Sequence, residues 1–133
     1  MILLDTHVLV YYSRDEKIGK RAMSAIDRAL GRDELYASAI SFWEVAMLLA
    51  KRRLALDMTV AAFRSTTLRE GLLEQPIDGE IAIAAGELPD AHGDPADRML
   101  VATAIVRGLT LVTADETLLG WKLRGFRAQD VTA

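Results

Sequence analysis

Four acidic residues lie at sequence positions where an α/β fold binds its ligands. Asp5 closes the apolar start of the chain and Asp115 follows the apolar run 109–113, while Glu44 and Asp97 lie early in two predicted helices. In an open parallel sheet, ligands bind outside the carboxyl ends of the strands, so acids from four separate segments are expected to meet at one edge. Carboxylate oxygens favour Mg²⁺ or Mn²⁺ over zinc, and such a cation can activate water and support in-line displacement at a phosphate.

Each acid also has a purely structural interpretation at a helix N-terminus. Ser41 and Glu44 fit an S-x-x-E capping box. Asp94 can cap a helix whose acidic first turn holds Asp97. Thr113 and Glu116 fit a T-x-x-E capping box, which leaves Asp115 in an acidic first turn. Asp5 could cap whatever element follows the first strand.

The neighbours of two acids favour the metal site over capping alone. Glu44 is the only polar residue in the stretch 42–50 and shares a helix face with residues that should be buried. Asp97 likewise shares a stripe with Val101 and Ala104. A buried, unpaired carboxylate costs several kcal/mol, and two such charges about 4 Å apart repel by ~4 kcal/mol at an effective dielectric of 20. The four acids together therefore predict a bound divalent cation.

The elements that must position these acids alternate along the chain. Short apolar runs predict strands at 2–4, 35–37, 73–75 and 109–113, with a weaker fifth strand near 126–127. Helical patterns cover residues 17–30, 41–53, 59–70, Gly79 to Glu87 and 96–107. The alternation predicts one α/β domain over residues 1–133, with a mostly parallel central sheet of four to five strands flanked by helices.

Composition excludes several classes of protein. The chain has 133 residues with 51% hydrophobic and 26% charged residues, which is typical of a folded protein rather than a disordered one. There is no cysteine, so disulfides, thiolate chemistry and a cysteine-ligated zinc are excluded. No apolar run approaches ~20 residues and the start lacks a signal pattern, so we expect a cytoplasmic protein without membrane association. The net charge of −3 gives no broad basic field for nucleic acid.

Four sequence blocks carry a family resemblance. In chain order they read LLDTHVLVYY, SFWEVAML, HGDPADRMLVATA and LVTADETL. Together they resemble the signature blocks of the PIN domain, and above all the single-domain toxins of VapBC-type toxin–antitoxin modules. The resemblance implies a toxin that acts as a Mg²⁺- or Mn²⁺-dependent endoribonuclease, is inhibited by a small cognate antitoxin and forms a homodimer.

The resemblance also assigns roles by position. It implies that Asp5, Glu44, Asp97 and Asp115 are the catalytic and metal-binding acids. Thr6, Asp94 and Thr113 match supporting positions. The expected reaction is attack of metal-activated water on the scissile phosphate of RNA, without a protein nucleophile. An antitoxin is expected to insert a basic side chain, preferably arginine, among the four acids.

Three other classes of function fit parts of the pattern. A Mg²⁺-binding receiver-like signalling domain would also carry acids at strand ends, but it needs an acid pair after the first strand, and Asp5 is followed by Thr6 and His7. Its phosphoacceptor would have to be Asp57, which falls between two predicted helices. A phosphatase with an aspartate nucleophile needs a second aspartate at the position of His7. A PIN-fold RNA-binding module without a toxin role remains a further alternative.

Other polar and aromatic residues have both functional and structural interpretations. His7 and His92 could contact phosphate or assist proton transfer, and Arg98 could bind phosphate or pair with Asp94. The cations at 51–53 could follow an RNA backbone or end a solvated helix. For the aromatic residues we expect core packing of Phe42 and Trp43, packing of Trp121 against the last strand, and a surface groove at Tyr11 and Tyr12.

Overall fold

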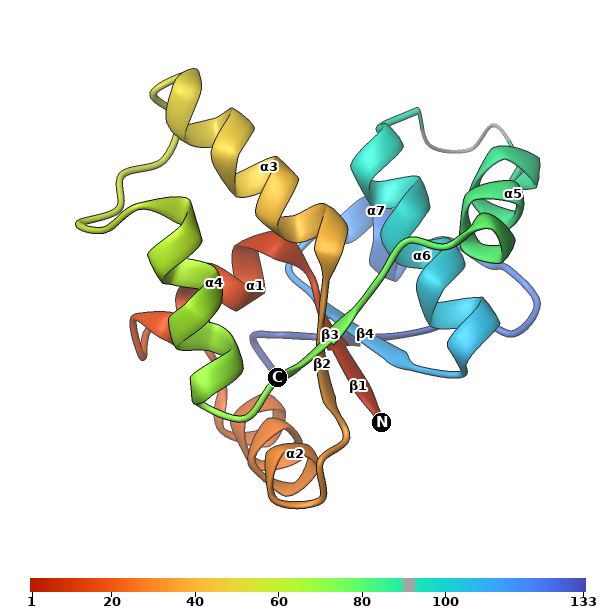
Figure 1. Ribbon diagram of the computed structural model, residues 1–133. Coiled ribbons are helices and arrows are strands. Elements are labelled where there is room, and N and C mark those ends of the chain that lie inside the picture. Colours follow the sequence, from red (N-terminus) through yellow and green to blue (C-terminus); the bar gives the residue numbers. More distant parts are fainter. Residues whose placement is uncertain (90–92) are drawn as a thin grey trace.

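The computed structural model describes residues 1–89 and 93–133 of the chain (Figure 1). His92, a candidate from the sequence, lies outside the described residues. The five strands form one sheet in the order β3-β2-β1-β4-β5, and every neighbouring pair is parallel. Their bounds are β1 Ile2–Leu4, β2 Leu35–Ser38, β3 Leu73–Gln75, β4 Thr110–Thr113 and β5 Arg127–Asp130. The predicted α/β class and parallel sheet are confirmed.

Seven helices connect the strands within the described residues. Their bounds are α1 Thr6–Ser13, α2 Lys20–Gly31, α3 Ala39–Ala50, α4 Val60–Arg69, α5 Gly79–Glu87, α6 Pro95–Arg107 and α7 Glu116–Leu119. Five of them match predicted helices to within a few residues, whereas α1 and α7 were not predicted. Helix α3 begins two residues earlier than expected because the Ser38 side chain accepts the backbone N–H of Ile40 at 3.1 Å. The predicted capping box of Ser41 and Glu44 is therefore wrong.

Helices cover both faces of the sheet, with alternate strand residues pointing to opposite sides. Ile2 and Leu4 of β1 pack into a core that also includes side chains from α1, α2, α3 and α4. Leu3 points the other way and packs with α6, β4 and α7. Figure 1 shows α1, α2 and α4 on one side of the sheet and α5 and α6 on the other. Short strands that are buried on both faces explain why β1 and β4 are apolar without alternation.

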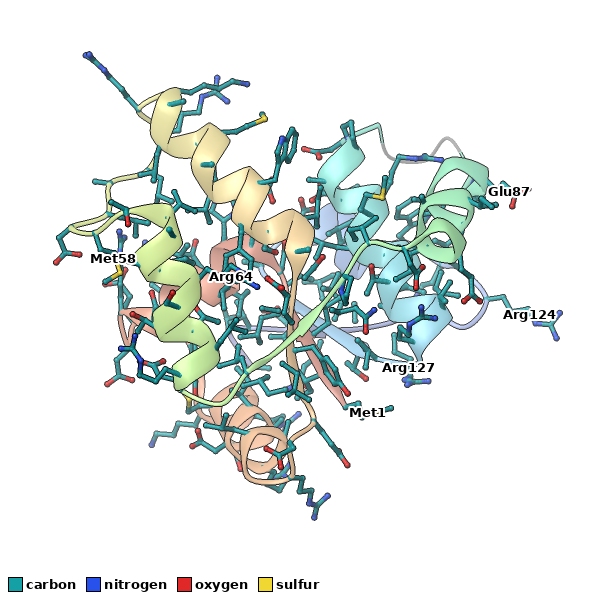
Figure 2. The ribbon with its side chains drawn as sticks, in the orientation of Figure 1. Met1, Met58, Arg64, Glu87, Arg124 and Arg127 are labelled. Atoms are coloured by element: carbon teal, nitrogen blue, oxygen red, sulfur yellow. The ribbon has the colours of Figure 1, made fainter. Side chains whose placement is uncertain are left out.

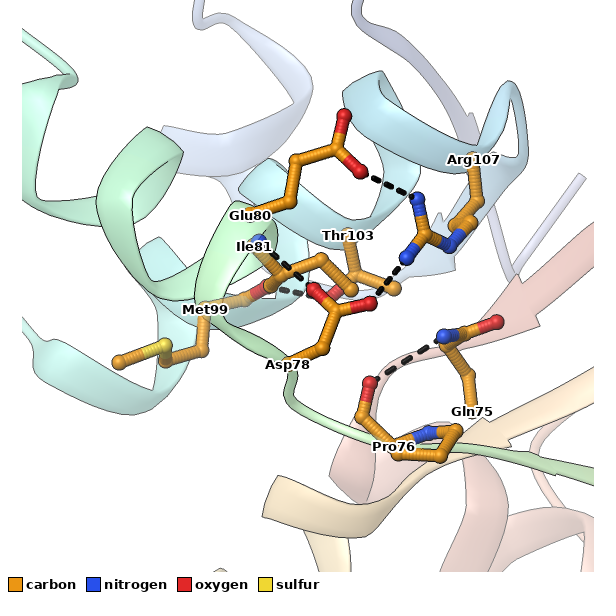
Figure 3. A network of polar contacts seen from close by, with 8 residues as sticks. All are labelled: Gln75, Pro76, Asp78, Glu80, Ile81, Met99, Thr103 and Arg107. Carbon is orange, nitrogen blue, oxygen red and sulfur yellow. Dashed lines mark hydrogen bonds and ion pairs between the residues drawn. The ribbon is translucent and has the colours of Figure 1, made fainter.

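A polar network joins α5 to the last turn of α6 (Figure 3). Asp78 caps α5 by accepting the N–H of Ile81 at 2.9 Å. The Arg107 guanidinium pairs with Asp78 and reaches Glu80 at 3.1 Å. Thr103 donates back to the carbonyl of Met99 in the same helix. These contacts fix α6, whose opposite end carries Asp97.

The C-terminal residues close over the start of α2. The N–H of Gly19 donates to the carbonyl of Val131 at 2.8 Å. A Cβ atom at Gly19 would lie 2.4 Å from the carbonyl oxygens of Thr132 and Ala133, so this close approach requires glycine. The helix predicted from residue 17 therefore starts only at Lys20. In the described part of the chain, no helix is both long and apolar enough to span a bilayer.

Candidate functional site

An acidic cavity lies at the carboxyl ends of β1 and β4. The strand order reverses direction between these two strands, which is the position where open α/β sheets bind ligands. The cavity has a volume of about 280 Å³, and the described residues that line it include five carboxylates and no lysine or arginine. The lining residues are Asp5, His7, Tyr11, Glu44, Asp94, Asp97, Ala114 and Asp115. The four acids from the sequence do meet, and Asp94 joins them.

Asp5 is the most buried of these acids, with 7% of its surface exposed. Its Oδ1 accepts the N–H of Thr6 at 2.7 Å, and its Oδ2 accepts the hydroxyl of Thr113 at 2.6 Å. Burial raises the pKa of Asp5 and the nearby Asp115 charge adds to the rise, although the two hydrogen bonds and His7 act in the opposite direction. The carboxylate is thus held in one orientation at the base of the cavity.

Thr113 connects Asp5 to Asp115. Its hydroxyl donates to Asp5 and accepts the N–H of Asp115 at 3.0 Å. Asp115 itself caps α7 because its Oδ1 accepts the N–H groups of Thr117 and Leu118 at 2.8 and 3.1 Å. The sequence placed Asp115 inside the first turn with Thr113 as the cap, and that assignment is wrong. The cap uses only Oδ1, so Oδ2 of Asp115 takes no part in it.

Thr6 connects α1 to α3 beneath Glu44. Its buried hydroxyl donates to the Oγ of Ser41 at 2.9 Å, and both side chains are fully enclosed. Sequence reasoning assigned Ser41 only a capping role and so missed this contact. The available signal was its position three residues before Glu44, which places both side chains on one helix face.

Glu44, Asp94 and Asp97 form the tightest group of carboxylates. One oxygen from each lies within 4.8 Å of the others, which is a spacing that could hold a metal ion. Burial raises the pKa of Glu44, and the charges of Asp5 and Asp94 raise it further, although the Thr6 hydroxyl and His7 oppose the shift. The Oε1 atom of Glu44 is buried and has no hydrogen-bond partner among the described residues.

Asp94 combines two roles that the sequence treated as alternatives. Its Oδ1 caps α6 by accepting the N–H groups of Ala96 and Asp97 at 2.9 and 3.2 Å. The predicted cap is therefore confirmed, and Asp94 also belongs to the carboxylate group. Because a carboxylate has two oxygens with several lone pairs, a cap leaves capacity for a metal.

The donor set fits a hard divalent cation. Among the described residues that line the cavity, all the charged groups are carboxylates, and oxygen ligands of this kind are typical of Mg²⁺ and Mn²⁺. The buried Oε1 of Glu44 is a polar atom that a cation would satisfy. The cavity is therefore a candidate metal centre.

The PIN domain family matches residues 2–119 of the chain. This chain belongs to the PIN-domain family. It is also 38% identical over 119 residues to Ribonuclease VapC22 of Mycobacterium tuberculosis, a match that covers 88% of each protein. It is thus a homologue of the VapC ribonucleases. PIN nucleases in general depend on divalent metals, in agreement with the acidic cluster found here.

Solved structures share the fold of this PIN domain. VapBC2 from Rickettsia felis, bound to a DNA fragment from its promoter, superposes with a TM-score of 0.71 at 16% identity over 98% of both chains. DNA-bound VapBC from Salmonella typhimurium superposes with a TM-score of 0.67 at 18% identity over 98% of both chains. At these identities the likeness concerns the fold, and both structures are toxin–antitoxin complexes.

The remaining candidates divide between the cavity and the scaffold of the PIN domain. His7 and Tyr11 line the cavity, whereas Tyr12 packs against the core. Arg98 donates to the carbonyls of Ala85, Leu88 and Pro89, so it ties the end of α5 to α6. These contacts support a structural role for Arg98.

Two aromatic neighbours on α3 behave differently. Phe42 is buried, as predicted, and it meets Phe63 edge to face. Trp43 is 49% exposed, so the prediction that it packs in the core is wrong. Successive residues of a helix point about 100° apart, and Phe42 occupies the inward direction. Asp57 lies between α3 and α4 rather than at a strand end, so it does not occupy a receiver-like position.

Proposed function

We propose that this PIN domain is the toxin of a type II toxin–antitoxin module and acts as a divalent-metal-dependent endoribonuclease. One observation carries the proposal: five carboxylates share a single cavity at the switch point of the sheet, and one buried oxygen of Glu44 has no partner among the described residues. The identity to a VapC ribonuclease over most of both chains supports the same activity. The nuclease domain of the proposal spans residues 1–133.

The four acids named from the sequence hold the metal in this proposal. Asp5, Glu44, Asp97 and Asp115 are the catalytic ligands of Mg²⁺ or Mn²⁺, and Asp94 supports them through the oxygen that does not cap α6. When bound, the cation supplies positive charge that makes water a better nucleophile and stabilises charge on the phosphate.

The protein's own residues prepare the site before a cation arrives. Thr113 and the N–H of Thr6 fix both oxygens of Asp5, so this ligand needs no rearrangement. Thr6 also reaches Ser41 and thereby fixes the start of α3 against α1, one turn before Glu44. RNA is a polyanion and five acids repel it, so a productive complex requires compensation of the cavity's charge.

The proposed partner is a small antitoxin that covers the acidic cavity. The same charge that repels RNA attracts a basic side chain, and the planar fork of arginine fits paired carboxylates. Exposed Trp43 lies next to Glu44 in the sequence and offers an apolar contact to such a partner. A homodimer is part of the proposal by family resemblance, and so is a cytoplasmic location.

The direct test compares RNA cleavage by four charge-neutralising variants. Asp5→Asn, Glu44→Gln, Asp97→Asn and Asp115→Asn are incubated with total RNA in Mg²⁺, Mn²⁺ or EDTA, and the new ends are sequenced. We expect at least a hundredfold loss of cleavage in each variant, and 5′-phosphate ends from the active protein. The matched control is Asp27→Asn, an exposed acid of α2, which should cleave normally. Wild-type rates in all four variants would reject the assignment.

A second experiment separates the toxin role from the nuclease activity. Expression of the chain alone should arrest growth, and co-expression of the adjacent small open reading frame should relieve the arrest. The purified complex should be inactive and should recover when the partner is digested. A harmless chain with no copurifying neighbour, but with metal-dependent cleavage in vitro, would leave the nuclease and reject the toxin.

A further inference from the structure

A second cavity lies beyond α7 and has the opposite charge character from the acidic one. Its volume is about 560 Å³. The described residues that line it include three cations and two aromatic rings and no acid. They are Leu119, Trp121, Lys122, Leu123, Arg124, Phe126, Arg127 and Ala128, here called the basic pocket. In a chain with a net charge of −3, this concentration of cations is local and requires an explanation.

The cations of the basic pocket are available to a ligand. Lys122, Arg124 and Arg127 are all exposed, and no ion pair joins any of them to an acid of the described chain. Arg127 is held by neutral groups, because it donates to the carbonyl of Gly108 at 3.2 Å and to the hydroxyl of Thr110 at 3.5 Å. Figure 2 shows the Arg124 side chain extending into solvent. Their charges are thus not neutralised by the fold.

The rings supply flat surfaces between these charges. Trp121 and Phe126 are half-buried, and each packs one side against the core that α6 and α7 share. Their remaining surface lines the basic pocket. Rings anchored in this way are rigid, and rigid aromatic platforms flanked by cations are the usual design of single-strand nucleic-acid sites.

The two cavities are connected by one short helix. Asp115 lines the acidic cavity and caps α7, and Leu119 at the other end of α7 lines the basic pocket. Four helical residues span only about 6 Å along the axis. A single-stranded flank that leaves the acidic cavity along α7 meets the basic pocket first at Leu119. Arg127 lies farther away, at the amino end of β5 opposite Thr110, so the flank must also pass along the edge of the sheet to reach it.

We propose that the basic pocket binds a single-stranded flank of the RNA substrate, with a base stacked on Trp121 and phosphates on Lys122 and Arg124. The proposal rests on the proposed nuclease function for the identity of the strand. The rings favour RNA over an acidic peptide or a small anion, because carboxylates and free phosphate gain nothing from an aromatic platform. A flank bound here holds the strand that the acidic cavity repels.

The test uses fluorescence of Trp121. The chain has two tryptophans, so Trp43→Phe leaves Trp121 as the only one. An oligouridylate is titrated into this protein in EDTA, which prevents metal-dependent cleavage. We expect saturable quenching. Unchanged fluorescence at saturating RNA overturns the proposal, as does quenching by oligoglutamate or by inorganic phosphate alone without quenching by RNA.

A charge variant with a matched control tests the cations. In Lys122→Gln/Arg124→Gln, the Kd for oligouridylate at 50 mM salt should rise at least tenfold. The slope of the logarithm of the association constant against the logarithm of the salt concentration should become less steep by about 1.4, because each phosphate contact on a single strand contributes ~0.7 to that slope and two contacts are lost. The control Lys20→Gln/Arg32→Gln removes one lysine and one arginine from the exposed surface of α2 and its C-cap. Equal effects of both double variants overturn the proposal.

Cleavage measurements separate this inference from the proposed function. If the protein cleaves RNA in Mn²⁺ but the pocket variant retains the wild-type KM on long and short substrates, the flank site is refuted and the nuclease stands. If the pocket binds oligouridylate but no metal supports cleavage, the nuclease is refuted and the pocket remains an RNA site. Equal melting temperatures of the pocket variant and its parent would confirm that the fold is intact.

Discussion

Neutralising Glu44 should stabilise the metal-free protein. The change Glu44→Gln keeps the shape of the side chain and removes one of three negative charges whose oxygens lie within 4.8 Å of one another. It also replaces a carboxylate whose buried Oε1 has no described partner by an amide, which is cheaper to bury. The substitution that should abolish activity is therefore expected to raise the melting temperature in EDTA.

The size of the effect follows from the spacing of the carboxylates. Two charges 4.8 Å apart repel by about 0.9 kcal/mol in water and by about 3.5 kcal/mol at an effective dielectric of 20. Glu44 repels both Asp94 and Asp97, and because Asp94 is exposed the value for water is the better guide. A gain of about 1–2 kcal/mol follows, which corresponds to about 4–8 °C in a domain of this size.

Thermal melts followed by circular dichroism measure this gain. The control Glu16→Gln removes an exposed acid from the loop between α1 and α2, where no ion pair is present among the described residues, and should shift the midpoint by less than ~0.5 kcal/mol. Mg²⁺ or Mn²⁺ at ten times Kd should stabilise the wild type by ~1.4 kcal/mol and the Glu44 variant by less. If the melting temperature of Glu44→Gln in EDTA is equal to or below that of the control variant, the carboxylates do not repel one another and the electrostatic reasoning is wrong.

Three further predictions concern the same site and its scaffold. In EDTA, Asp5 and Glu44 should lower stability as the pH rises above their ordinary pKa values of 3.8 and 4.5, because folding raises both pKa values and the folded state then binds more protons. The melting temperature of the doubly neutralised variant, measured from pH 4 to 7, should fall less than that of the wild type, and parallel curves would contradict this. Thr113→Val should lower kcat at least tenfold because Asp5 loses the hydrogen bond that orients its carboxylate, and Thr113→Ser should restore kcat. If the Val and Ser variants have equal kcat values, Thr113 does not orient Asp5 for catalysis. Arg107→Met should lower the urea concentration at the midpoint of unfolding through the lost contacts to Asp78, with cleavage retained, whereas an unchanged midpoint would show that the network is dispensable.

The sheet and its acidic edge could be predicted because they depend on local pattern. Short apolar runs mark β1 and β4, and the acids that follow them must lie at the carboxyl edge of a parallel sheet. Helix α1 was missed because its residues are apolar around most of its circumference, so periodicity gave no helical signal. Helix α7 has only four residues, which is too short for any periodic pattern.

The side-chain contacts inside the site could not be predicted from the chain alone. The hydrogen bond from Thr113 to Asp5 joins residues 108 positions apart, and that from Thr6 to Ser41 joins residues 35 apart. Neither pair shares a local motif, because the first depends on the pairing of β1 with β4 and the second on the contact between α1 and α3. The orientation of Trp43 was wrong for the same reason, since an apolar helix does not reveal which of its sides faces solvent.

In this site the residues that cap helices also line the acidic cavity, so helix capping and metal binding are compatible roles of the same carboxylates. Asp5, Asp94 and Asp115 are the N-cap residues of α1, α6 and α7, and all three line the acidic cavity. The positive ends of three helices therefore point at the acids, and each end stabilises a nearby anion by ~0.3–1 kcal/mol. That sum offsets only part of the repulsion among five carboxylates, which amounts to about 1 kcal/mol for each close pair even in water. The fold can thus assemble the acids without a cation but leaves the cluster under net repulsion, and this residual repulsion is what a divalent metal or an antitoxin arginine would relieve on binding.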